Sequence, residues 1–255
     1  MRIATYNVNG VNGRLPRLLE WLGETAPDVV CLQEIKTEDH KCPAEAIERA
    51  GYGSVWHGQR SHHGVAILAK GGTLREIRRG LPGGTGDPQA RYLEAEVNGL
   101  VVASIYLPNG NPQPGPKFDY KLAWFDRLNA HAQTLLDAAR PTVLAGDLNV
   151  VPTNDDIYNA WAWRFDAVMQ PETREAYRRL LAQGWIDTHR VLHPKERVYT
   201  FWVNHDYFRR NAGFRMDFVL LSPDLALRLQ SAGVDTAHRG REKASDHAPT
   251  WVTLS

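Results

Sequence analysis

Two polar side chains that could do chemistry follow an apolar, strand-forming run near the middle of the chain. The run covers residues 142–146, and Asp147 and Asn149 follow it, separated by one apolar residue. Because side chains alternate along a strand, the carboxylate and the carboxamide project from the same side. Asp and Asn are poor strand formers, and such local conflicts are expected at functional sites. A polar turn after a strand is the alternative interpretation, since Gly and Asn also supply turn geometry.

Similar polar side chains occur at the ends of other strand-like segments. One carboxylate at a strand end is unremarkable, but six ends that carry a carboxylate, carboxamide, phenol or imidazole are hard to explain as turns alone. The function hypothesis therefore depends on their co-occurrence. These other residues are Asn7, Glu34, Tyr106, Asn109, Asp217, Asp246 and His247.

The chemistry that suits this set is metal-assisted hydrolysis of a phosphodiester. A phosphodiester is anionic and repels hydroxide, and a hard divalent cation held by carboxylate oxygens neutralises charge in the transition state. An all-oxygen set favours Mg²⁺ over zinc, which prefers Cys and paired His ligands. Structural alternatives stay open for single members. Glu34 could be a surface carboxylate, Asp217 could pair with Arg215, and Asp246 with His247 could form a structural hydrogen-bonded pair.

Composition sets only broad limits. The chain has 255 residues, 43% of them hydrophobic, so it can fill a substantial core. Lys plus Arg number 30 and Asp plus Glu 29, and this balance neither supports nor excludes a nucleic-acid partner. Of the two cysteines, Cys31 lies in an apolar run and is predicted to be a buried thiol. The low cysteine count, with no apolar run near 18 residues, predicts a cytoplasmic protein without a membrane helix.

The segment order predicts a single domain over residues 1–255, with mixed sheets packed face to face and helices outside. Residues 108–116 hold four prolines and two glycines and are predicted to be an irregular loop, for which a binding role is favoured over a simple crossover. Strands are predicted at 3–8, 28–33, 65–70, 92–97, 100–106, 142–146, 215–221 and 249–254. Helices are predicted at 15–24, 44–50, 118–139 and 172–183.

Taken together and in order, these residues resemble the exonuclease III and apurinic/apyrimidinic (AP) endonuclease family of the endonuclease/exonuclease/phosphatase superfamily. The resemblance spans nearly the whole chain and implies an α/β fold, the four-layered αββα sandwich of deoxyribonuclease I-like proteins. This agrees with the order of strands and helices. The matching segments are Tyr6–Gly10, Asp28–Glu34, His63–Ala66, Tyr106–Gly110, Gly146–Asn149, Tyr199–Trp202, Arg215–Asp217 and Ser245–Pro249.

The resemblance implies a metal site built from several of these segments. Glu34 looks like the main Mg²⁺ ligand, with Mn²⁺ as a possible substitute, and Asn7 looks like a residue that positions it. Asp246 is implied as a further ligand, and Asp147 and Asn149 as additional ones. Asn9 stands where the family often has Asp, and this leaves the number of metals open.

The resemblance also implies catalytic roles. Asp147 looks like the residue that orients and activates the attacking water, and Tyr106 matches the phenol near the phosphate and the leaving oxygen. Asp217 looks like the residue that orients the His247 imidazole. The implied phosphate-binding residues are Asn109, Asn149 and His247.

Substrate choice is expected to come from apolar residues beside the acidic segments. By resemblance, Phe201, Phe214 and Met216 look like walls of a pocket for a base-less sugar, with Trp202 beside them, although packing in a core is the alternative. Nearby arginines could contact backbone phosphates, and four other cations are weaker candidates. The arginines are Arg209, Arg210 and Arg215, and the weaker candidates are Arg14, Lys36, Lys117 and Lys121.

The expected function is a Mg²⁺-dependent DNA-repair phosphodiesterase that cuts 5′ to an abasic site and can trim 3′ ends in the 3′-to-5′ direction. Its expected partner is double-stranded DNA with abasic sites or 3′ ends, bound by a monomer. Two alternatives stay open at this point. One is a phosphodiesterase or phosphatase acting on inositol phosphates or phospholipids, and the other is a non-catalytic module that binds damaged DNA.

Overall fold

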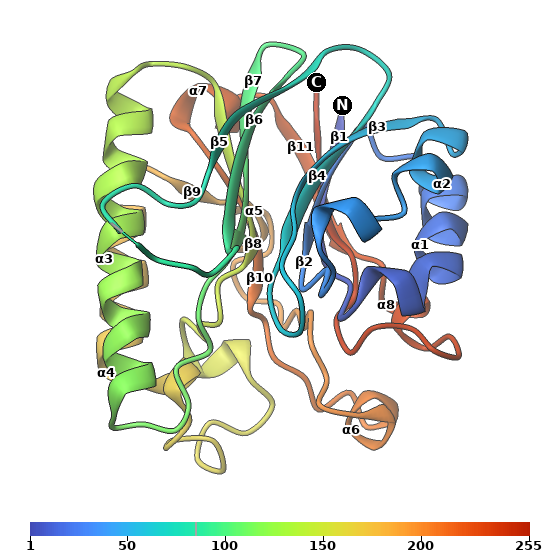
Figure 1. Cartoon of the computed structure of the whole chain (residues 1–255). Helices are drawn as coiled ribbons and strands as arrows, with labels where there is room; N and C mark the ends of the chain where they lie inside the picture. Colours follow the sequence, from blue (N-terminus) through green and yellow to red (C-terminus); the bar gives the residue numbers. More distant parts are fainter. Residues whose placement is uncertain (85) are drawn as a thin grey trace.

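Two sheets packed face to face form the centre of the protein, with helices on the outer side of each (Figure 1). The computed structural model describes residues 1–84 and 86–255. Each sheet has six strands and mixes parallel with antiparallel pairs. The predicted αββα sandwich is therefore confirmed. Within the described residues, no helix is both long and apolar enough to span a bilayer.

The first sheet contains both ends of the chain, since β1 and β12 pair with each other (Figure 1). Its strand order is β11-β12-β1-β2-β4-β3. The strands are β1 (Arg2–Asn7), β2 (Val29–Gln33), β3 (Tyr52–His57), β4 (Val65–Lys70), β11 (Leu229–Val234) and β12 (Thr250–Leu254). Its outer face carries α1 (Val11–Thr25), α2 (Ala44–Arg49) and α8 (Thr236–Arg239).

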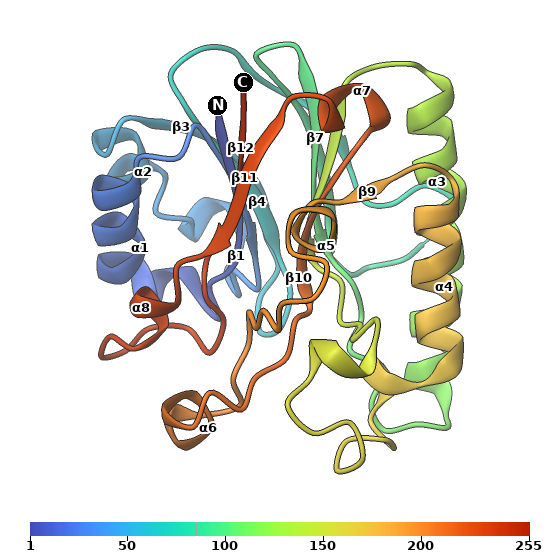
Figure 2. The ribbon, with the colours of Figure 1, turned by 180° about the vertical axis from the view of Figure 1, so that it is seen from behind.

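The second sheet has the order β5-β6-β7-β8-β10-β9. Its strands are β5 (Leu74–Arg79), β6 (Tyr92–Val97), β7 (Leu100–Tyr106), β8 (Thr142–Asp147), β9 (Ile186–Asp187) and β10 (Asp217–Leu221). Two long helices, α3 (Pro116–Asp137) and α4 (Pro171–Ala182), cover its outer face (Figure 2). The shorter helices are α5 (Thr188–Leu192), α6 (His205–Arg209) and α7 (Pro223–Ala226), and α6 projects from one end of the molecule.

Every strand predicted from the sequence is present, with ends shifted by two residues at most. The strands that were not predicted are β3, β5, β9 and β11, which are the outermost strands of the two sheets. Such strands have one unpaired edge and less burial, and in β5 two half-buried apolar residues are each followed by two exposed charged ones. Their hydrophobic pattern is therefore too weak to read. The four predicted helices are also present, while the short helices α5 to α8 were missed.

The layer between the two sheets is apolar and gathers the inward side chains of both. Ile3, Val29 and Cys31 of the first sheet pack in one cluster with Val102 and Val143 of the second. Cys31 is fully buried and forms no disulfide, so the prediction of a buried thiol is confirmed. This apolar layer fixes the position of one sheet relative to the other, and so it also fixes the relative positions of the loops at the strand ends.

Arg215 is part of this interior and does not face DNA. Its exposed fraction is 2%, and its guanidinium donates to Asp156 at 2.6 Å and to Asp187 at 2.8 and 3.0 Å. The prediction that Arg215 contacts a backbone phosphate is therefore wrong, and so is its suggested pairing with Asp217. The cluster ties the segment before β10 to two neighbouring loops. Its burial was invisible in the sequence because both acidic partners lie far along the chain.

We predict that Arg215→Met destabilises the fold by about 3–5 kcal/mol, because it leaves two buried carboxylates short of their cation. The test is to compare the urea denaturation midpoints of the variant and the parent. Near-native activity of the variant at low urea would show that its site is still formed. Arg209→Ala is the matched control, since Arg209 is exposed on α6 and should leave the midpoint unchanged. An Arg215→Met protein with unchanged stability but weakened DNA binding would support the original prediction that Arg215 contacts a backbone phosphate.

Candidate active site

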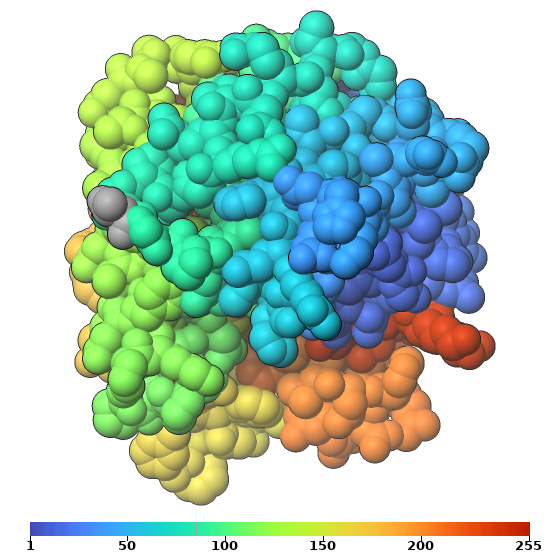
Figure 3. Space-filling view, viewed as in Figure 1, coloured from blue at the N-terminus to red at the C-terminus, as the bar shows by residue number. Residues whose placement is uncertain are grey.

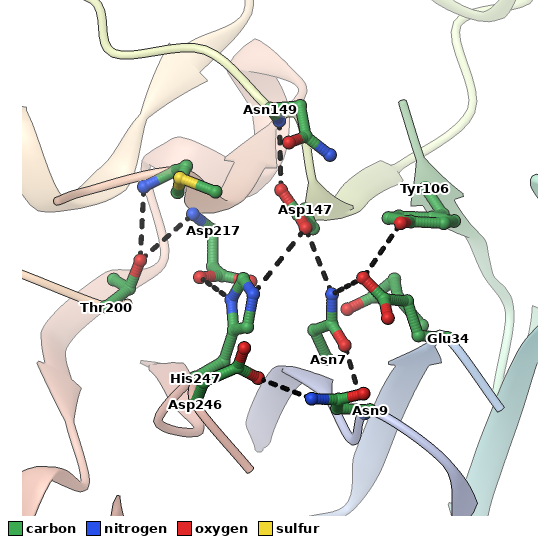
Figure 4. Close-up of polar contacts among 12 residues, drawn as sticks. Asn7, Asn9, Glu34, Tyr106, Asp147, Asn149, Thr200, Asp217, Asp246 and His247 are labelled. Carbon is green, nitrogen blue, oxygen red and sulfur yellow. Dashed lines mark hydrogen bonds and ion pairs between the residues drawn. The ribbon is translucent and has the colours of Figure 1, made fainter. Parts of the chain in front are cut away.

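The predicted strand-end residues meet at one end of the sandwich. Tyr106 of β7 lies beside Asp147 of β8 in the ladder, and Asp217 of β10 lies on the other side of Asp147. Asn7 ends β1 of the opposite sheet, and His247 precedes β12 (Figure 4). Both sheets therefore contribute side chains to one buried polar cluster, as the strand-end pattern predicted.

Gly146 allows β7 and β8 to approach closely just before this cluster. A Cβ at Gly146 would overlap the carbonyl oxygen of Ile105 on the neighbouring strand. The absence of a side chain there keeps the ladder continuous up to Asp147, which is 1% exposed. The Gly-Asp sequence thus has a structural reason besides turn formation.

A carboxylate–imidazole–carboxylate row lies at the centre of the site. The Nδ1 atom of His247 is 2.8 Å from Oδ2 of Asp217, and its Nε2 atom is 3.9 Å from Oδ2 of Asp147. Thr200 holds Asp217 in place, because its hydroxyl accepts from the Asp217 backbone N–H at 3.1 Å. All three members of the row are buried (Figure 4).

Burial makes the charges of this row strongly interdependent. Burial raises the pKa of Asp147, Asp217 adds to the rise, and the positive charge of His247 opposes it. Burial alone would lower the pKa of His247, but the adjacent Asp217 carboxylate outweighs it and raises that pKa well above its usual range. The imidazole is thus held as a cation between two acidic groups, one of which binds protons near neutral pH.

Asn7 connects this row to Glu34. Its Nδ2 atom donates to Oε1 of Glu34 and to Oδ2 of Asp147, at 3.0 Å in both cases. Glu34 also accepts from the Tyr106 hydroxyl at 2.8 Å. The amide nitrogen of Asn7, and not its oxygen, faces both carboxylates. The Asn7 amide therefore lies where it can position the Glu34 carboxylate, the part that the resemblance implies for it.

Glu34 is turned into the site by an unusual backbone conformation. Its φ is +50°, in the left-handed region that few non-glycine residues adopt. Burial raises the pKa of the Glu34 carboxyl, but hydrogen bonds from Asn7 and Lys36 outweigh it and hold the pKa below its usual value. An ionised carboxylate in a half-buried position with strained backbone is a costly arrangement that indicates a ligand-binding role.

The oxygens around Glu34 suit a hard cation. The Lys36 ammonium lies 2.8 Å from Oε2 of Glu34 and 2.5 Å from Oδ1 of Asn9, so a positive charge already sits between two oxygens. Asn9 in turn donates to Oδ1 of Asp246 at 3.0 Å. Carboxylate and amide oxygens are the ligands that Mg²⁺ prefers, and these residues fit such an ion.

A second group of possible ligands is Asp147, Asp217 and His247, whose ligand atoms lie within 4.8 Å of one another. The Nδ1 atom of His247 is already hydrogen-bonded to Asp217 there. This pairing suits proton transfer and charge stabilisation better than metal ligation. We therefore favour the oxygen set around Glu34 as the metal site.

Two asparagines form the other wall of the site. Asn149 accepts at Oδ1 from Nδ2 of Asn109 at 3.2 Å, and its backbone N–H donates to Asp147 at 2.9 Å. Lys121 of α3 is fully buried and donates to the backbone carbonyls of Asn109 and Asn149. Lys121 therefore fixes the two loops that carry these asparagines. Its interpretation as a phosphate contact is wrong, because its ammonium is out of reach of solvent.

An apolar pocket of about 250 Å³ adjoins this wall. The predicted residues Phe201, Phe214 and Met216 line it, and the Phe201 ring centre is 4.7 Å from that of His247. Trp202 does not line it: its ring is buried against Phe208 and Tyr199, so its inclusion was wrong. The residues missed by sequence reasoning are Trp163, Asp166, Val168 and Val203.

Trp163 was missed because the segment after β8 has no regular pattern. Its ring meets Phe214 edge to face with centres 4.8 Å apart, and its indole N–H donates to the Tyr158 hydroxyl. The available signal was the concentration of tryptophans at 161 and 163 within a polar loop. Arg209 and Arg210, by contrast, stay exposed on and just after α6, where a DNA backbone can reach them.

Comparisons with known proteins agree with this geometry. Residues 4–247 match the endonuclease/exonuclease/phosphatase family. Exodeoxyribonuclease III of Haemophilus influenzae is 34% identical over 265 residues that cover 99% of each chain. Two solved structures each cover all of this chain, with 99% of their own chain covered. One is an AP endonuclease from Archaeoglobus fulgidus, with 33% identity and a TM-score of 0.95.

The other is a 3′ phosphatase from Neisseria bound to a product DNA hairpin, with 35% identity and a TM-score of 0.96. These likenesses extend over the whole chain and include the buried acidic site. The chain therefore belongs to the endonuclease/exonuclease/phosphatase family, in which it is an enzyme of the exonuclease III and AP endonuclease type.

Proposed function

We propose that this DNA-repair nuclease hydrolyses the phosphodiester 5′ to an abasic nucleotide, leaves a 3′-hydroxyl, and also removes nucleotides or blocking groups from 3′ ends. The observation that carries the proposal is the position of the 250 Å³ apolar pocket directly beside the Asp147–His247–Asp217 row. A nucleotide held in the pocket would present its phosphate to buried acid–base groups. The pocket selects the substrate and the row acts on it.

The pocket walls favour a sugar that lacks its base. Phe201, Phe214 and Trp163 pack edge to face and line the pocket with apolar surface, so their rings offer no polar partner to the edge of a base. An abasic nucleotide has no pairing partner, so its rotation out of the duplex costs little energy. A polyphosphorylated inositol ring would place several negative charges against these apolar walls, and this disfavours the phosphatase alternative.

Asp147 is suited to act as the general base. Its Oδ1 accepts from the Asn149 backbone and its Oδ2 from Asn7, so the carboxylate has a fixed orientation. Its raised pKa allows it to take a proton from water near neutral pH, as an efficient base should. The water oxygen would then bond to phosphorus while the bond to the 3′-oxygen breaks. A module that only binds DNA needs no such base.

Charge on the phosphate oxygens would be met by polar side chains on the opposite wall. The His247 cation, oriented by Asp217, faces the reacting group through Nε2. Amide N–H groups of Asn149 and Asn109 can donate to phosphate without adding charge. Burial and the nearby Glu34 carboxylate raise the pKa of Tyr106 well above its usual value. Its phenol therefore stays protonated, and its O–H, which here donates to Glu34, would turn to the leaving oxygen in the complex.

Glu34, Asp246 and Asn9 would hold a Mg²⁺ ion, with Mn²⁺ as a substitute, and the ion would neutralise phosphate charge in the transition state. Asn7 links Glu34 and Asp147 by donating to both, so a cation on one side and a base on the other can coexist. Lys36 occupies oxygens of Glu34 and Asn9 and would have to swing away.

Trimming of 3′ ends needs only that a terminal nucleotide or 3′-phosphate reach the same phosphorus position. The Neisseria relative is named a 3′ phosphatase, and the Haemophilus relative is named an exonuclease. Both names suit a site in which the scissile phosphate, and not the base, is the group recognised by polar side chains. The same machinery thus supports both activities.

We predict that a labelled duplex with a central abasic site is cut once, 5′ to that site, while the same duplex with a recessed 3′ end is shortened stepwise. Gel analysis of both substrates resolves the two patterns. Asp147→Asn should lower the rate of both reactions by roughly 10²–10⁴-fold, because it removes the general base. Binding to abasic DNA should survive, because the variant keeps the same shape.

An Asp147→Asn protein that cuts at the parent rate would sink the assignment of the base. Asp224→Asn is the matched control, since Asp224 is exposed on α7 at the opposite end of the molecule. Cleavage of inositol phosphates in preference to both duplexes would instead support the phosphatase alternative.

We predict that EDTA stops the reaction and that added Mg²⁺ or Mn²⁺ restores it, because the oxygen set around Glu34 suits hard cations. Glu34→Gln should raise the Mg²⁺ concentration needed for half-maximal activity by about tenfold or more. The melting temperature with and without the metal gives a readout independent of turnover. Its rise on metal addition should be smaller in Glu34→Gln than in the parent. Full activity in EDTA would refute the metal requirement.

We predict that Asp217→Asn lowers the pKa of His247, because it removes the carboxylate that holds the imidazole charged. A raised pKa in the folded state contributes stability below the unfolded value of about 6.5, and this is lost as pH rises through the folded pKa. The variant should therefore lose more stability at pH 6 than at alkaline pH, and its activity should fall earlier on the alkaline side. NMR titration of the His247 ring, with equilibrium unfolding at several pH values, measures both effects. An unchanged His247 titration would contradict the assigned pairing.

A further inference from the structure

An exposed aromatic and cationic cluster lies on the loop that supplies Trp163 and Asp166 to the apolar pocket. It consists of Trp161, Arg164 and Phe165, in the loop between β8 and α4. The Trp161 side chain is 72% exposed and the Phe165 side chain 71%. The Arg164 guanidinium carbon lies 3.9 Å from the Trp161 ring centre and 4.3 Å from the Phe165 ring centre. One cation is thus flanked by two aromatic rings that face solvent.

The loop that carries this cluster is firmly held. The Gln170 side chain donates to the backbone carbonyls of Arg164 and Asp166, at 3.0 and 2.9 Å. Gln113 donates to the Phe165 carbonyl at 2.8 Å. A flexible loop could expose an aromatic ring by chance, but here a fixed backbone presents two of them. The packing of the protein itself therefore does not explain why these two rings face solvent.

The cluster is continuous with the pocket. Trp163, between the two exposed rings in sequence, turns inward and lines the pocket with Asp166. Phe201 and Val203, on the segment that leads to α6, line the pocket from the other side. The yellow loop and the orange α6 segment project from the same end of the molecule (Figures 2 and 3). A strand whose nucleotide enters the pocket from this end would lie near the loop that carries the exposed rings.

We propose that Trp161, Arg164 and Phe165 form a stacking platform for an unpaired nucleobase next to the nucleotide in the pocket. Aromatic faces stack on any base, and an adjacent guanidinium adds cation–π attraction and a donor for the neighbouring phosphate. Arg164 donates to the Trp161 carbonyl at 2.7 Å and not to a carboxylate, so its charge is available to an anionic strand. The inference rests on the proposed function in one respect, that DNA occupies the site.

Two sources could supply the unpaired base. One is the base opposite an abasic nucleotide, and the other is the terminal base of a frayed 3′ end. Both offer a free π-face close to the scissile phosphate, so the platform recognises the chemistry that they share. It would hold the strand in place while the pocket takes the reacting nucleotide.

The test uses 2-aminopurine, whose fluorescence falls when it stacks on an indole or phenyl ring. Two duplexes are needed, one with 2-aminopurine opposite an abasic site and one with it at a recessed 3′ terminus. Binding is measured with Asp147→Asn protein so that the DNA stays intact. We expect Trp161→Ala with Phe165→Ala to weaken binding by about tenfold or more and to abolish protein-induced quenching on at least one duplex.

Leu227→Ala is the matched control, because Leu227 is 90% exposed next to α7 at the opposite end of the molecule. It removes exposed apolar surface far from the pocket and should change neither affinity nor quenching. Trp161→Phe keeps an aromatic face and should retain most of the parent affinity. Equal melting temperatures of these proteins show that the fold is intact, since the changed side chains are exposed.

The duplex that loses quenching identifies the source of the base. The inference would be overturned if the parent protein cuts DNA but the double variant keeps the same affinity and quenching on both duplexes. The exposed rings would then be better explained by a protein partner. Failure of the parent to cut or bind either duplex would instead overturn the proposed function. The two failures are therefore distinguishable.

Discussion

The buried row of Asp147, His247 and Asp217 is the interaction on which the site depends. Two carboxylates lie opposite each other in the β8–β10 ladder, where their charges would repel strongly without a cation between them. The His247 imidazole supplies that cation from the other sheet, since it precedes β12. Catalytic geometry and the packing of the two sheets are therefore coupled: a shift of one sheet against the other would separate the imidazole from its partners and leave buried charge uncompensated.

Asn7 extends this coupling to the metal-binding side. A single amide group donates to Glu34 and to Asp147, which come from different sheets. An amide carries no charge, so it can hold two anionic groups near each other without cancelling either. The base thus keeps its proton affinity, while the oxygens around Glu34 keep the negative potential that attracts a divalent cation. One neutral link separates the two halves of the chemistry and fixes their spacing.

Cations in this protein serve two separate purposes. Arg215 and Lys121 are buried, and each binds groups of the protein itself, two carboxylates in one case and two backbone carbonyls in the other. Both stabilise loops that form the site. Arg164 and Arg209 lie instead on the two projecting segments and are not buried. Near-neutral total charge is consistent with this division, because only local clusters need to face DNA.

Much of the fold could be predicted from the sequence, because the central strands are continuous apolar runs that end in polar residues. The strands at the sheet edges could not, since β3, β5, β9 and β11 are only partly buried and their residues carry no clear pattern. The sequence also determined which residues stand at strand ends, and so most members of the acidic cluster. Only tertiary structure decided that Arg215 and Lys121 point inward, that Trp202 lies outside the pocket, and that Trp163 lines it. Such outcomes depend on partners far along the chain, and burial of a long side chain is settled by packing and not by its neighbours in sequence.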